Sequence, residues 1–372
     1  MTRTVSFWTV TATLGLFLFA AAAPSPLYAV YAARWHFSAI TLTEVFGVYA
    51  LALLVALLFT GSLSDYVGRR PVILGAVAVQ LVAVLMFVAA SDVAWLFVAR
   101  ITQGIATGVA SSVLAAALVD LQPTDHPPLA PLVNAVTPVL GLAAGALASA
   151  VVVQYAPDPL HLVYWMILAG LLAIGGATFL MPEPGAKKAG ISLAPHVGVE
   201  APIRPQFLAS LPSLIAGWAV GGFYLSLGPS LALQLAGSTN RLLGGSTITV
   251  LGGVGSIAIV ALRAWLPRRT MVVGGVAMTA GLLLAVLAVA TTSAGLFFVS
   301  TAVTGVGFGI GWLGVLRSLV ALAAPTSRAA LLAAIFIVAY LSFAIPAVAA
   351  GYLVTRVGLH QAALLYAAAM DL

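Results

Sequence analysis

The sequence contains no cysteine and very few charged residues. Only 6% of its residues are Asp, Glu, Lys or Arg, whereas roughly 25% is usual for a soluble domain. The absence of cysteine excludes disulfides, thiol catalysis and cysteine-ligated metals. The shortage of charge leaves the chain with too little polar surface to face water on all sides.

Common catalytic patterns are absent as well. The sequence has no Gly-x-x-x-x-Gly-Lys-Ser/Thr loop, which argues against ATP-driven transport, and no His-Glu-x-x-His pattern. No apolar run contains the pair of acidic residues that would indicate an intramembrane protease. We therefore expect neither an enzyme nor a bound cofactor. The histidines fall in links or at the ends of apolar runs, which does not suit a metal site: His36, His126, His161, His196 and His360.

Long apolar runs dominate the chain. Hydrophobic residues make up 62% of it, and the runs last about twenty residues, the length that a helix needs to cross a bilayer. A membrane β-barrel would instead show alternating segments of roughly ten residues. The formal charge of +6 comes from residues scattered between the runs, which indicates membrane orientation signals rather than nucleic-acid binding. We therefore predict an all-α integral membrane protein.

Twelve apolar runs are predicted as membrane spans. The first resembles a signal peptide with its small residues 21–23, but it is long enough to span. The last has only 15 residues, so either the twelfth helix is short or the chain lacks its C-terminal end, and we favour the second. The runs are 5–30, 40–61, 71–91, 93–119, 129–155, 160–181, 207–235, 242–262, 270–291, 294–324, 329–354 and 358–372.

One long polar stretch divides the runs into two sets of six. It covers 183–206 and is rich in Pro and Gly, which is typical of a linker. The flanking halves are 1–182 and 207–372. Two glycines of the fourth run recur in the tenth at an offset of 201 residues, Gly104 as Gly305 and Gly108 as Gly309. This echo predicts two pseudo-symmetric six-helix bundles.

The basic residues lie mostly on one side of the predicted bundle. With a cytoplasmic N-terminus, the inner links hold ten of the 15 Lys and Arg residues and the outer links hold three. The positive-inside rule therefore predicts that the N-terminus is cytoplasmic, and we expect the plasma membrane of a bacterium. The ten inner residues are Arg3, Arg69, Arg70, Lys187, Lys188, Arg204, Arg263, Arg268, Arg269 and Arg328.

The link between the second and third runs carries a distinctive pattern. It reads Gly61-Ser-Leu-Ser-Asp65-Tyr-Val-Gly68-Arg69-Arg70, and its two glycines permit a turn with positive φ. The pattern Gly-x-Leu-x-Asp-x-x-Gly-Arg-Arg resembles the signature loop between helices 2 and 3 of major facilitator superfamily transporters. With the span count and the central linker, the resemblance covers essentially the whole chain. It implies alternating access, in which two helical halves rock about a central site.

The same resemblance implies a charged gate. In the family, acidic and basic residues of this loop bridge to helix 11 and to an acid near the end of helix 4, which keeps the outward-open state shut inside. The matching positions are Asp65, Arg69 and Asp120. The alternative is that these charges only set the membrane orientation.

An arginine within the fourth run is the sharpest candidate for proton coupling. An arginine inside a membrane helix costs at least ~2.5–3.5 kcal/mol, so it is retained mainly where it faces a cavity or a partner. The segment from Arg100 through Gln103 and Gly104 to Gly108 resembles the family's helix 4 motif, in which the arginine is linked to proton transfer. The alternative is that Arg100 snorkels to the interface. The two glycines allow close helix approach.

Two further ionisable residues are weaker candidates for coupling or for the cavity. Glu44 lies near the outer end of the second span, where a buried carboxylate would be a proton carrier. The alternative is an interfacial carboxylate in water. Arg317 lies in the tenth span and either lines the inner cavity or snorkels.

The fifth run contains Thr137-Pro138-Val-Leu-Gly141-Leu-Ala-Ala-Gly145. It is similar to the Gly-Pro-x-x-Gly-Gly motif of the family's antiporters, in which a kinked and closely packed helix favours export. Thr137 and Leu142 replace two of the motif's glycines. The alternative is general helix packing, because Pro and Gly are frequent in membrane helices.

The leading hypothesis is a proton-coupled antiporter that exports a small apolar or cationic molecule. Uptake by a symporter or uniporter is the alternative, and a non-transporting membrane sensor is a third. We expect a small-molecule substrate, the lipid bilayer as surroundings, no nucleic acid and a monomer. Five aromatic residues either line a substrate pocket or pack the bundle: Trp218, Tyr224, Trp312, Phe336 and Tyr340.

Overall fold

The computed structural model describes residues 1–123, 129–185, 194–195, 197–324 and 327–370. These residues form helices and connecting turns, with no strand among them. The helices are α1 (Arg3–Ala22), α2 (Tyr28–Trp35), α3 (Ala39–Thr60), α4 (Leu63–Val67), α5 (Arg69–Val88), α6 (Val93–Leu121), α7 (Ala130–Tyr155), α8 (Leu162–Phe179), α9 (Arg204–Ser226), α10 (Gly228–Ala236), α11 (Arg241–Leu262), α12 (Pro267–Ala290), α13 (Ala294–Leu322) and α14 (Arg328–Met370), with a 3₁₀ turn at Ala201–Ile203.

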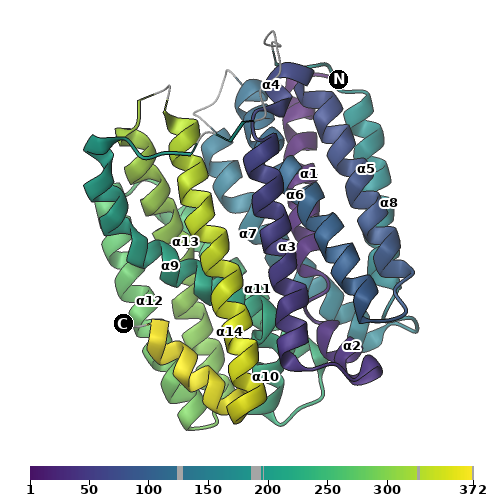
Figure 1. The fold of residues 1–372 in the computed structure, drawn as a ribbon, viewed down its shortest axis with the longest axis vertical. Helices are drawn as coiled ribbons and strands as arrows, with labels where there is room; N and C mark the ends of the chain where they lie inside the picture. The colour runs from purple at the N-terminus through teal and green to yellow at the C-terminus, as the bar shows by residue number, and fades with distance from the viewer. Residues whose placement is uncertain (124–128, 186–193, 196, 325–326, 371–372) are drawn as a thin grey trace.

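Eleven of the helices in the described part of the chain are long and apolar enough to cross a membrane. The longest, α14, is interrupted at Gly358, whose φ of 81° only glycine adopts readily. After this residue the chain turns back into the bundle (Figure 1). The final segment, 359–370, is shorter than a full span. The prediction of an all-α membrane protein is thereby confirmed.

Two predicted spans are each divided into two helices. The first run, 5–30, ends as α1 at Ala22, because Pro24 and Pro26 cannot continue the hydrogen-bond ladder of a helix. The seventh run is divided at Leu227, just before Pro229. In both halves the first spanning helix is therefore followed by a short second one, α2 or α10.

The helices form two bundles that lie side by side in Figure 1, α1 to α8 in one and α9 to α14 in the other. We call the end that carries the N-terminus and α4 the N-terminal end, and the opposite end, near α2 and α10, the far end. The predicted linker, 183–206, includes residues 186–193 and 196, which lie outside the described residues. The helix α9 begins within its last part, at Arg204.

The closest approaches between the bundles lie toward the far end. They occur along two seams, α3 with α14 and α7 with α11. In the first seam, Gly351 lies so close to Thr43 that a Cβ would collide with its hydroxyl. In the second, a Cβ at Gly245 would collide with Ala150 and would lie 2.8 Å from the carbonyl oxygen of Ala146. The bundles are therefore closed against each other at the far end.

Two hydrogen bonds also cross the second seam. The hydroxyl of Thr249 donates to the carbonyl oxygen of Ala143 over 3.1 Å. The backbone N–H of Arg241 donates to the side-chain oxygen of Gln154 over 2.8 Å. Because α11 begins at the far end with Arg241, both bonds reinforce the same closed end.

Glycines hold equivalent helices together in the two bundles. Because Gly104 has no side chain, α6 can pack directly on α3. A Cβ at this position would collide with the carbonyl oxygen of Tyr49. The repeat-related Gly305 likewise allows α13 to pack directly on α11, because a Cβ there would lie only 2.6 Å from the carbonyl oxygen of Leu251. Such close packing drives helix association in lipid, where burial of apolar surface contributes little. The offset of 201 residues thus has a structural basis.

This packing predicts opposite effects for two alanine substitutions. Gly108→Ala should lower the free energy of unfolding by ~1–3 kcal/mol, because a Cβ would collide with the carbonyl oxygen of Leu53. Gly75→Ala should be neutral or slightly stabilising, since no atom lies within 4 Å of its Cβ position and alanine favours helix. Thermal unfolding of the purified variants measures both. Equal midpoints would contradict the packing role of Gly108.

Candidate functional site

Arg100 is fully buried within the first bundle. Its Nε donates to the hydroxyl of Tyr28 over 2.6 Å. One terminal nitrogen donates to the carbonyl oxygen of Ala21 over 2.9 Å and to Oε1 of Gln103 over 2.6 Å. The guanidinium therefore points into the protein, and the structure does not place it at a lipid–water interface.

The end of α1 explains part of this geometry. Because the helix stops at Ala22, the carbonyl groups of Ala20 and Ala21 accept no backbone N–H from the described chain. Arg100 binds the carbonyl oxygen of Ala21, and Nε2 of Gln103 donates to that of Ala20 over 3.0 Å. A cation at this position also opposes the partial negative charge of a helix C-terminus.

No carboxylate of the described chain forms an ion pair with Arg100. Its second terminal nitrogen is buried without a described partner. The rings of Tyr28, Tyr49 and Phe87 lie 5.1–5.9 Å from its central carbon, at distances where an aromatic face attracts a cation. A buried positive charge held only by neutral groups creates a strong local field, because the surroundings screen it weakly.

An aromatic layer extends from this site toward the far end. Tyr31 stacks on Trp35 with ring centroids 4.7 Å apart, and Tyr164 stacks on Phe87 at 4.9 Å. Burial raises the pKa of Tyr31 to about 12, so its hydroxyl stays protonated and donates to that of Tyr164 over 3.3 Å. The layer contains no charged group that neutralises Arg100.

The other two residues predicted with Arg100 do not join it. Glu44 is half-buried on α3 and forms no hydrogen bond or ion pair with the described residues. Arg317 donates to the carbonyl oxygens of Arg263 and Trp265, over 2.8 and 3.1 Å. It therefore secures the turn between α11 and α12 in the second bundle.

The predicted gate residues form a charged cluster at the N-terminal end. A terminal nitrogen of Arg69 lies 2.6 Å from Oδ1 of Asp65 and donates to the hydroxyl of Ser64 over 2.6 Å. Nε of Arg69 lies 2.9 Å from Oδ2 of Asp120. The cluster therefore fixes α4 and α5 to the end of α6. Arg3 adds α1 by donating to the backbone carbonyl oxygen of Asp120 over 2.8 Å.

Glu183 completes this cluster, although sequence reasoning missed it. Its two carboxylate oxygens accept from the backbone N–H groups of Arg69 and Arg70, over 2.6 and 3.1 Å. The carboxylate thus caps the start of α5, a position where negative charge is stabilising. An acid directly after the sixth span, on the same side as the start of the third, was the available signal. Arg70 itself lies over the ring of Phe179, 5.1 Å from its centroid.

The two glycines of this loop behave differently. Gly68 has a φ of 109°, which an L side chain adopts only with strain. Gly61 has a φ of −56° and is helical, so the expectation of a positive φ there was wrong. The described hydrogen bonds of Arg69 all stay within the first bundle. In this state, which is closed at the far end, Arg69 therefore makes no described bridge to the eleventh predicted span, the first part of α14.

Pro138, Gly141 and Gly145 lie within α7. A Cβ at Gly141 would lie 2.6 Å from the carbonyl oxygen of Gly15, and one at Gly145 would collide with that of Phe19. This face of α7 therefore packs closely on α1, while the residues of the second seam face α11. The motif thus lies in the helix that joins the core of the first bundle to the seam.

Four of the five candidate pocket aromatics meet in the second bundle. Trp218 contacts the rings of Trp312 and Tyr340 edge-on at 5.2 and 4.9 Å. Phe336 lies 6.1 Å from both Trp312 and Tyr340. All four are partly exposed. We call them the aromatic cluster.

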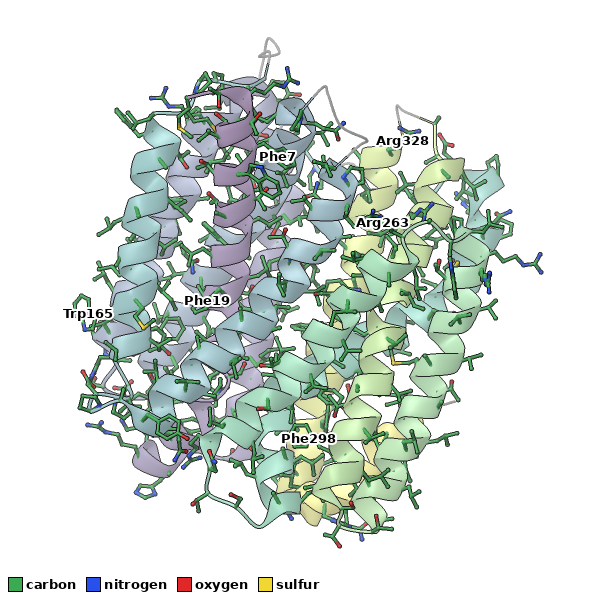
Figure 2. All side chains as sticks on the ribbon, turned by 180° about the vertical axis from the view of Figure 1, so that it is seen from behind. Phe7, Phe19, Trp165, Arg263, Phe298 and Arg328 are labelled. Carbon is green, nitrogen blue, oxygen red and sulfur yellow. The ribbon has the colours of Figure 1, made fainter. Side chains whose placement is uncertain are left out.

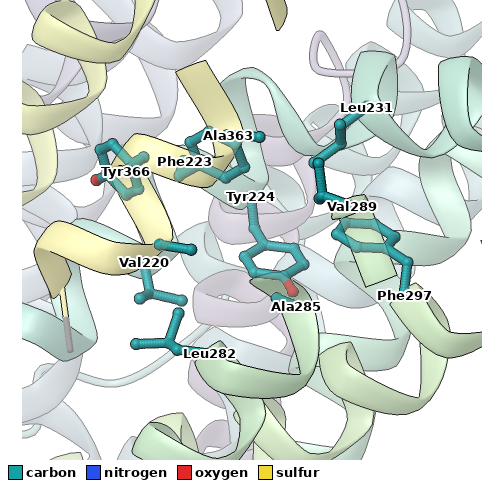
Figure 3. A pocket seen from close by; sticks show the side chains of 11 residues that line it. Val220, Phe223, Tyr224, Leu231, Leu282, Ala285, Val289, Phe297, Ala363 and Tyr366 are labelled. Carbon is teal, nitrogen blue, oxygen red and sulfur yellow. The ribbon is translucent and has the colours of Figure 1, made fainter. Parts of the chain in front are cut away.

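Tyr224 lies elsewhere, beside an apolar cavity of about 20 Å³ (Figure 3). Its hydroxyl is 3.1 Å from that of Thr301, and its ring stacks on Phe297 at 5.9 Å. A cavity of this size has room for about one water molecule, so it is a packing defect and cannot hold an organic substrate.

Comparison with known proteins gives consistent matches. The family model described as Major Facilitator Superfamily matches residues 6–269. Multidrug resistance protein MdtL of Citrobacter koseri is 25% identical over 273 residues, which cover 71% of this chain and 69% of that protein. MdtL of Shewanella oneidensis is 30% identical over 196 residues, 52% of this chain and 48% of that protein.

Solved transporter structures share the fold. A bacterial homolog of the human lysosomal transporter Spinster, in an inward-facing and occupied conformation, superposes with a TM-score of 0.77 at 13% identity, over 99% of this chain and 96% of that one. The nucleoside transporter NupG gives 0.74 at 14% identity, over 98% and 96%. At these identities the likeness concerns the fold alone.

Proposed function

Because the chain belongs to the Major Facilitator Superfamily and is therefore a membrane transporter rather than an enzyme, we propose that it exports a small organic molecule in exchange for protons. The observation that carries the proposal is the fully buried Arg100, which has no carboxylate partner among the described residues. A desolvated charge is costly and is kept inside a membrane protein mainly for function. The names of the MdtL relatives support export of drugs.

In this proposal Arg100 acts through its field. A guanidinium does not release its proton in proteins, so the moving proton must be held by another group. Glu44 is the proposed carrier, because it lies on α3, whose Tyr49 ring contacts Arg100, and because it has no described partner. The positive field of Arg100 would favour loss of the proton whenever Glu44, or a water molecule bound to it, approaches the guanidinium.

The proposed substrate binds at the aromatic cluster. Faces and edges of Trp218, Trp312, Phe336 and Tyr340 favour flat apolar molecules and, through the ring quadrupole, a single delocalised positive charge. From residue 201 to residue 370 the sequence contains no Asp or Glu. The second bundle thus offers no carboxylate to a multiply charged cation.

Asp65, Arg69 and Asp120 form the proposed gate. The distribution of basic residues supports a cytoplasmic N-terminal end, and therefore a cytoplasmic gate. Switching to the alternate state would separate the seams at the far end and bring the N-terminal ends of the bundles together. Ion pairs of this kind are individually weak, but they bias a two-state equilibrium when they differ between the states.

Substrate-driven proton movement in inverted membrane vesicles tests the proposal. After the membrane is energised, addition of the flat aromatic cation ethidium should dissipate part of the pH gradient, which a ΔpH-sensitive dye reports. Vesicles without the protein are the control. No dye response to ethidium or to a panel of neutral aromatic drugs, with the protein shown to be inserted, would contradict proton-coupled export.

The substrate site is tested with two tryptophan variants. Trp218→Ala should raise the half-saturating ethidium concentration about three- to tenfold, as expected from the loss of one aromatic contact. Trp165→Ala is the matched control, because Trp165 is 47% exposed and points away from the bundle (Figure 2). An equal change in both variants would show that the aromatic cluster does not bind the substrate.

A further inference from the structure

A polar pocket of about 280 Å³ lies at the far end of the first bundle. Its volume is close to the roughly 300 Å³ at which small-ligand sites begin. It is formed by α2, by the turn between α5 and α6, and by the start of α8. Its lining includes Tyr31, Arg34, Trp35, Phe87, Ala89, Ala90 and His161.

One side of the pocket is positive. Arg34 lies in the last turn of α2 and is exposed. Its guanidinium forms no hydrogen bond or ion pair with the residues that the structure describes. His161 is already engaged, because its Nδ1 lies 2.7 Å from Oδ1 of Asp158. The guanidinium of Arg34 is therefore the charged group of the pocket that is available to a ligand. Its planar arrangement of N–H donors matches the oxygens of a phosphate group.

The opposite side is partly negative. The helix α5 ends at Val88 with no basic residue in its last turn. In the described chain, the carbonyl oxygens of Ala89 and Ala90 accept no hydrogen bond. A helix C-terminus carries a partial charge of roughly −0.5, and free carbonyl groups there can accept hydrogen bonds from an ammonium group.

The remaining wall is aromatic and lies at the level where the spanning helices begin and end. Trp35 stacks on Tyr31, and Trp and Tyr are enriched at the headgroup level of membranes. A phosphate site, an ammonium site and an aromatic wall are thus combined at that depth. We propose that this pocket binds the headgroup of a zwitterionic phospholipid, with the phosphate on Arg34 and a primary ammonium on the carbonyl oxygens of Ala89 and Ala90.

The pocket is separate from the proposed transport site and does not depend on it. It nevertheless shares one wall with the surroundings of Arg100, because Phe87 lines the pocket and also lies 5.9 Å from the central carbon of Arg100. The ring of Phe87 therefore lies between a bound headgroup and the guanidinium of Arg100.

Lipid binding to the purified full chain in detergent tests the proposal by native mass spectrometry. Three lipids with identical acyl chains are compared: phosphatidylethanolamine, phosphatidylcholine and phosphatidylglycerol. Phosphatidylethanolamine should bind best, because the choline group has no N–H to donate and the glycerol group carries no positive charge. Arg34→Gln should weaken this binding roughly tenfold, as expected for one charge-assisted contact.

Arg356→Gln is the matched control. Arg356 is also an exposed arginine beside an aromatic ring, 5.1 Å from the centroid of Tyr352, but it does not line this pocket. Equal binding of the three lipids, or equal weakening in both variants, would overturn the proposal. Glycerophosphoethanolamine, which is the headgroup without chains, should fail to displace the lipid at equal concentration. Displacement would show that the pocket binds a water-soluble phosphate ester with an amine rather than a membrane lipid, which would also overturn the proposal.

Discussion

Arg100→Gln is expected to abolish substrate-driven proton movement, with a loss of roughly a hundredfold or more. Glutamine can still bond to the carbonyl oxygen of Ala21 or to Gln103, but it removes the buried positive charge from the first bundle. Charge-assisted hydrogen bonds contribute up to ~3 kcal/mol each, and each ~1.4 kcal/mol corresponds to a factor of ten. The same vesicle assay measures the loss.

Arg100→Lys separates charge from geometry. Lysine keeps the positive charge but cannot bind Tyr28, Ala21 and Gln103 simultaneously with a planar fork. We therefore expect it to retain measurable proton movement at a reduced rate. If the lysine variant is as inactive as the glutamine variant, then orientation of the charge, and not its presence alone, is required.

Arg317→Gln provides the matched control. Arg317 is likewise an arginine within a spanning helix, but its partners are two backbone carbonyl groups at the turn between α11 and α12. Its replacement should leave proton coupling intact. Normal coupling in the Arg100→Gln variant would contradict the proposed role of Arg100. Equal loss in both variants would attribute the effect to general disturbance of the bundle.

The sequence predicted the fold because in lipid each helix satisfies its own backbone and needs only an apolar run of sufficient length. It also predicted which glycines pack, since Gly104 and Gly108 are four residues apart and share one helix face. The exact helix ends were less accessible. The break before Tyr28 follows from Pro24 and Pro26, yet the apolar character continues through it, and hydropathy alone does not show the interruption.

The candidate site was predicted only in part, because its contacts depend on how several helices meet. The structure buries Tyr28 against Arg100, although the two residues are far apart in the sequence. The carbonyl oxygen of Ala21 carries no sequence signal at all. The Arg69 cluster was more predictable, because charged residues of neighbouring links gather at the same end of a helical bundle. Glu44 lies on α3 in the first bundle and Arg317 on α13 in the second, and no sequence pattern shows how far apart residues of two such helices lie.

Gly245→Val is expected to shift the protein from the state seen here toward one that is open at the far end. Valine cannot fit at this position, because its Cβ alone would collide with Ala150 of α7. Overpacking of this kind costs ~1–3 kcal/mol. The cost applies only while the seam is closed, so it changes the ratio of the two states by a factor of about five to a hundred. Gly253→Val on the same helix is the control, because no atom lies within 4 Å of its Cβ position.

A cysteine introduced in the other seam reports the change. The chain has no cysteine of its own, and Thr43 is fully buried against Gly351 in this state. Thr43→Cys should therefore react slowly with a membrane-impermeant maleimide, and about tenfold faster when combined with Gly245→Val. Because the substitution lies between α7 and α11 and the reporter between α3 and α14, faster labelling requires the bundles to move apart as units. Unchanged labelling would contradict a gate at this end, whereas an equal rise with Gly253→Val would mean that valine only loosens α11.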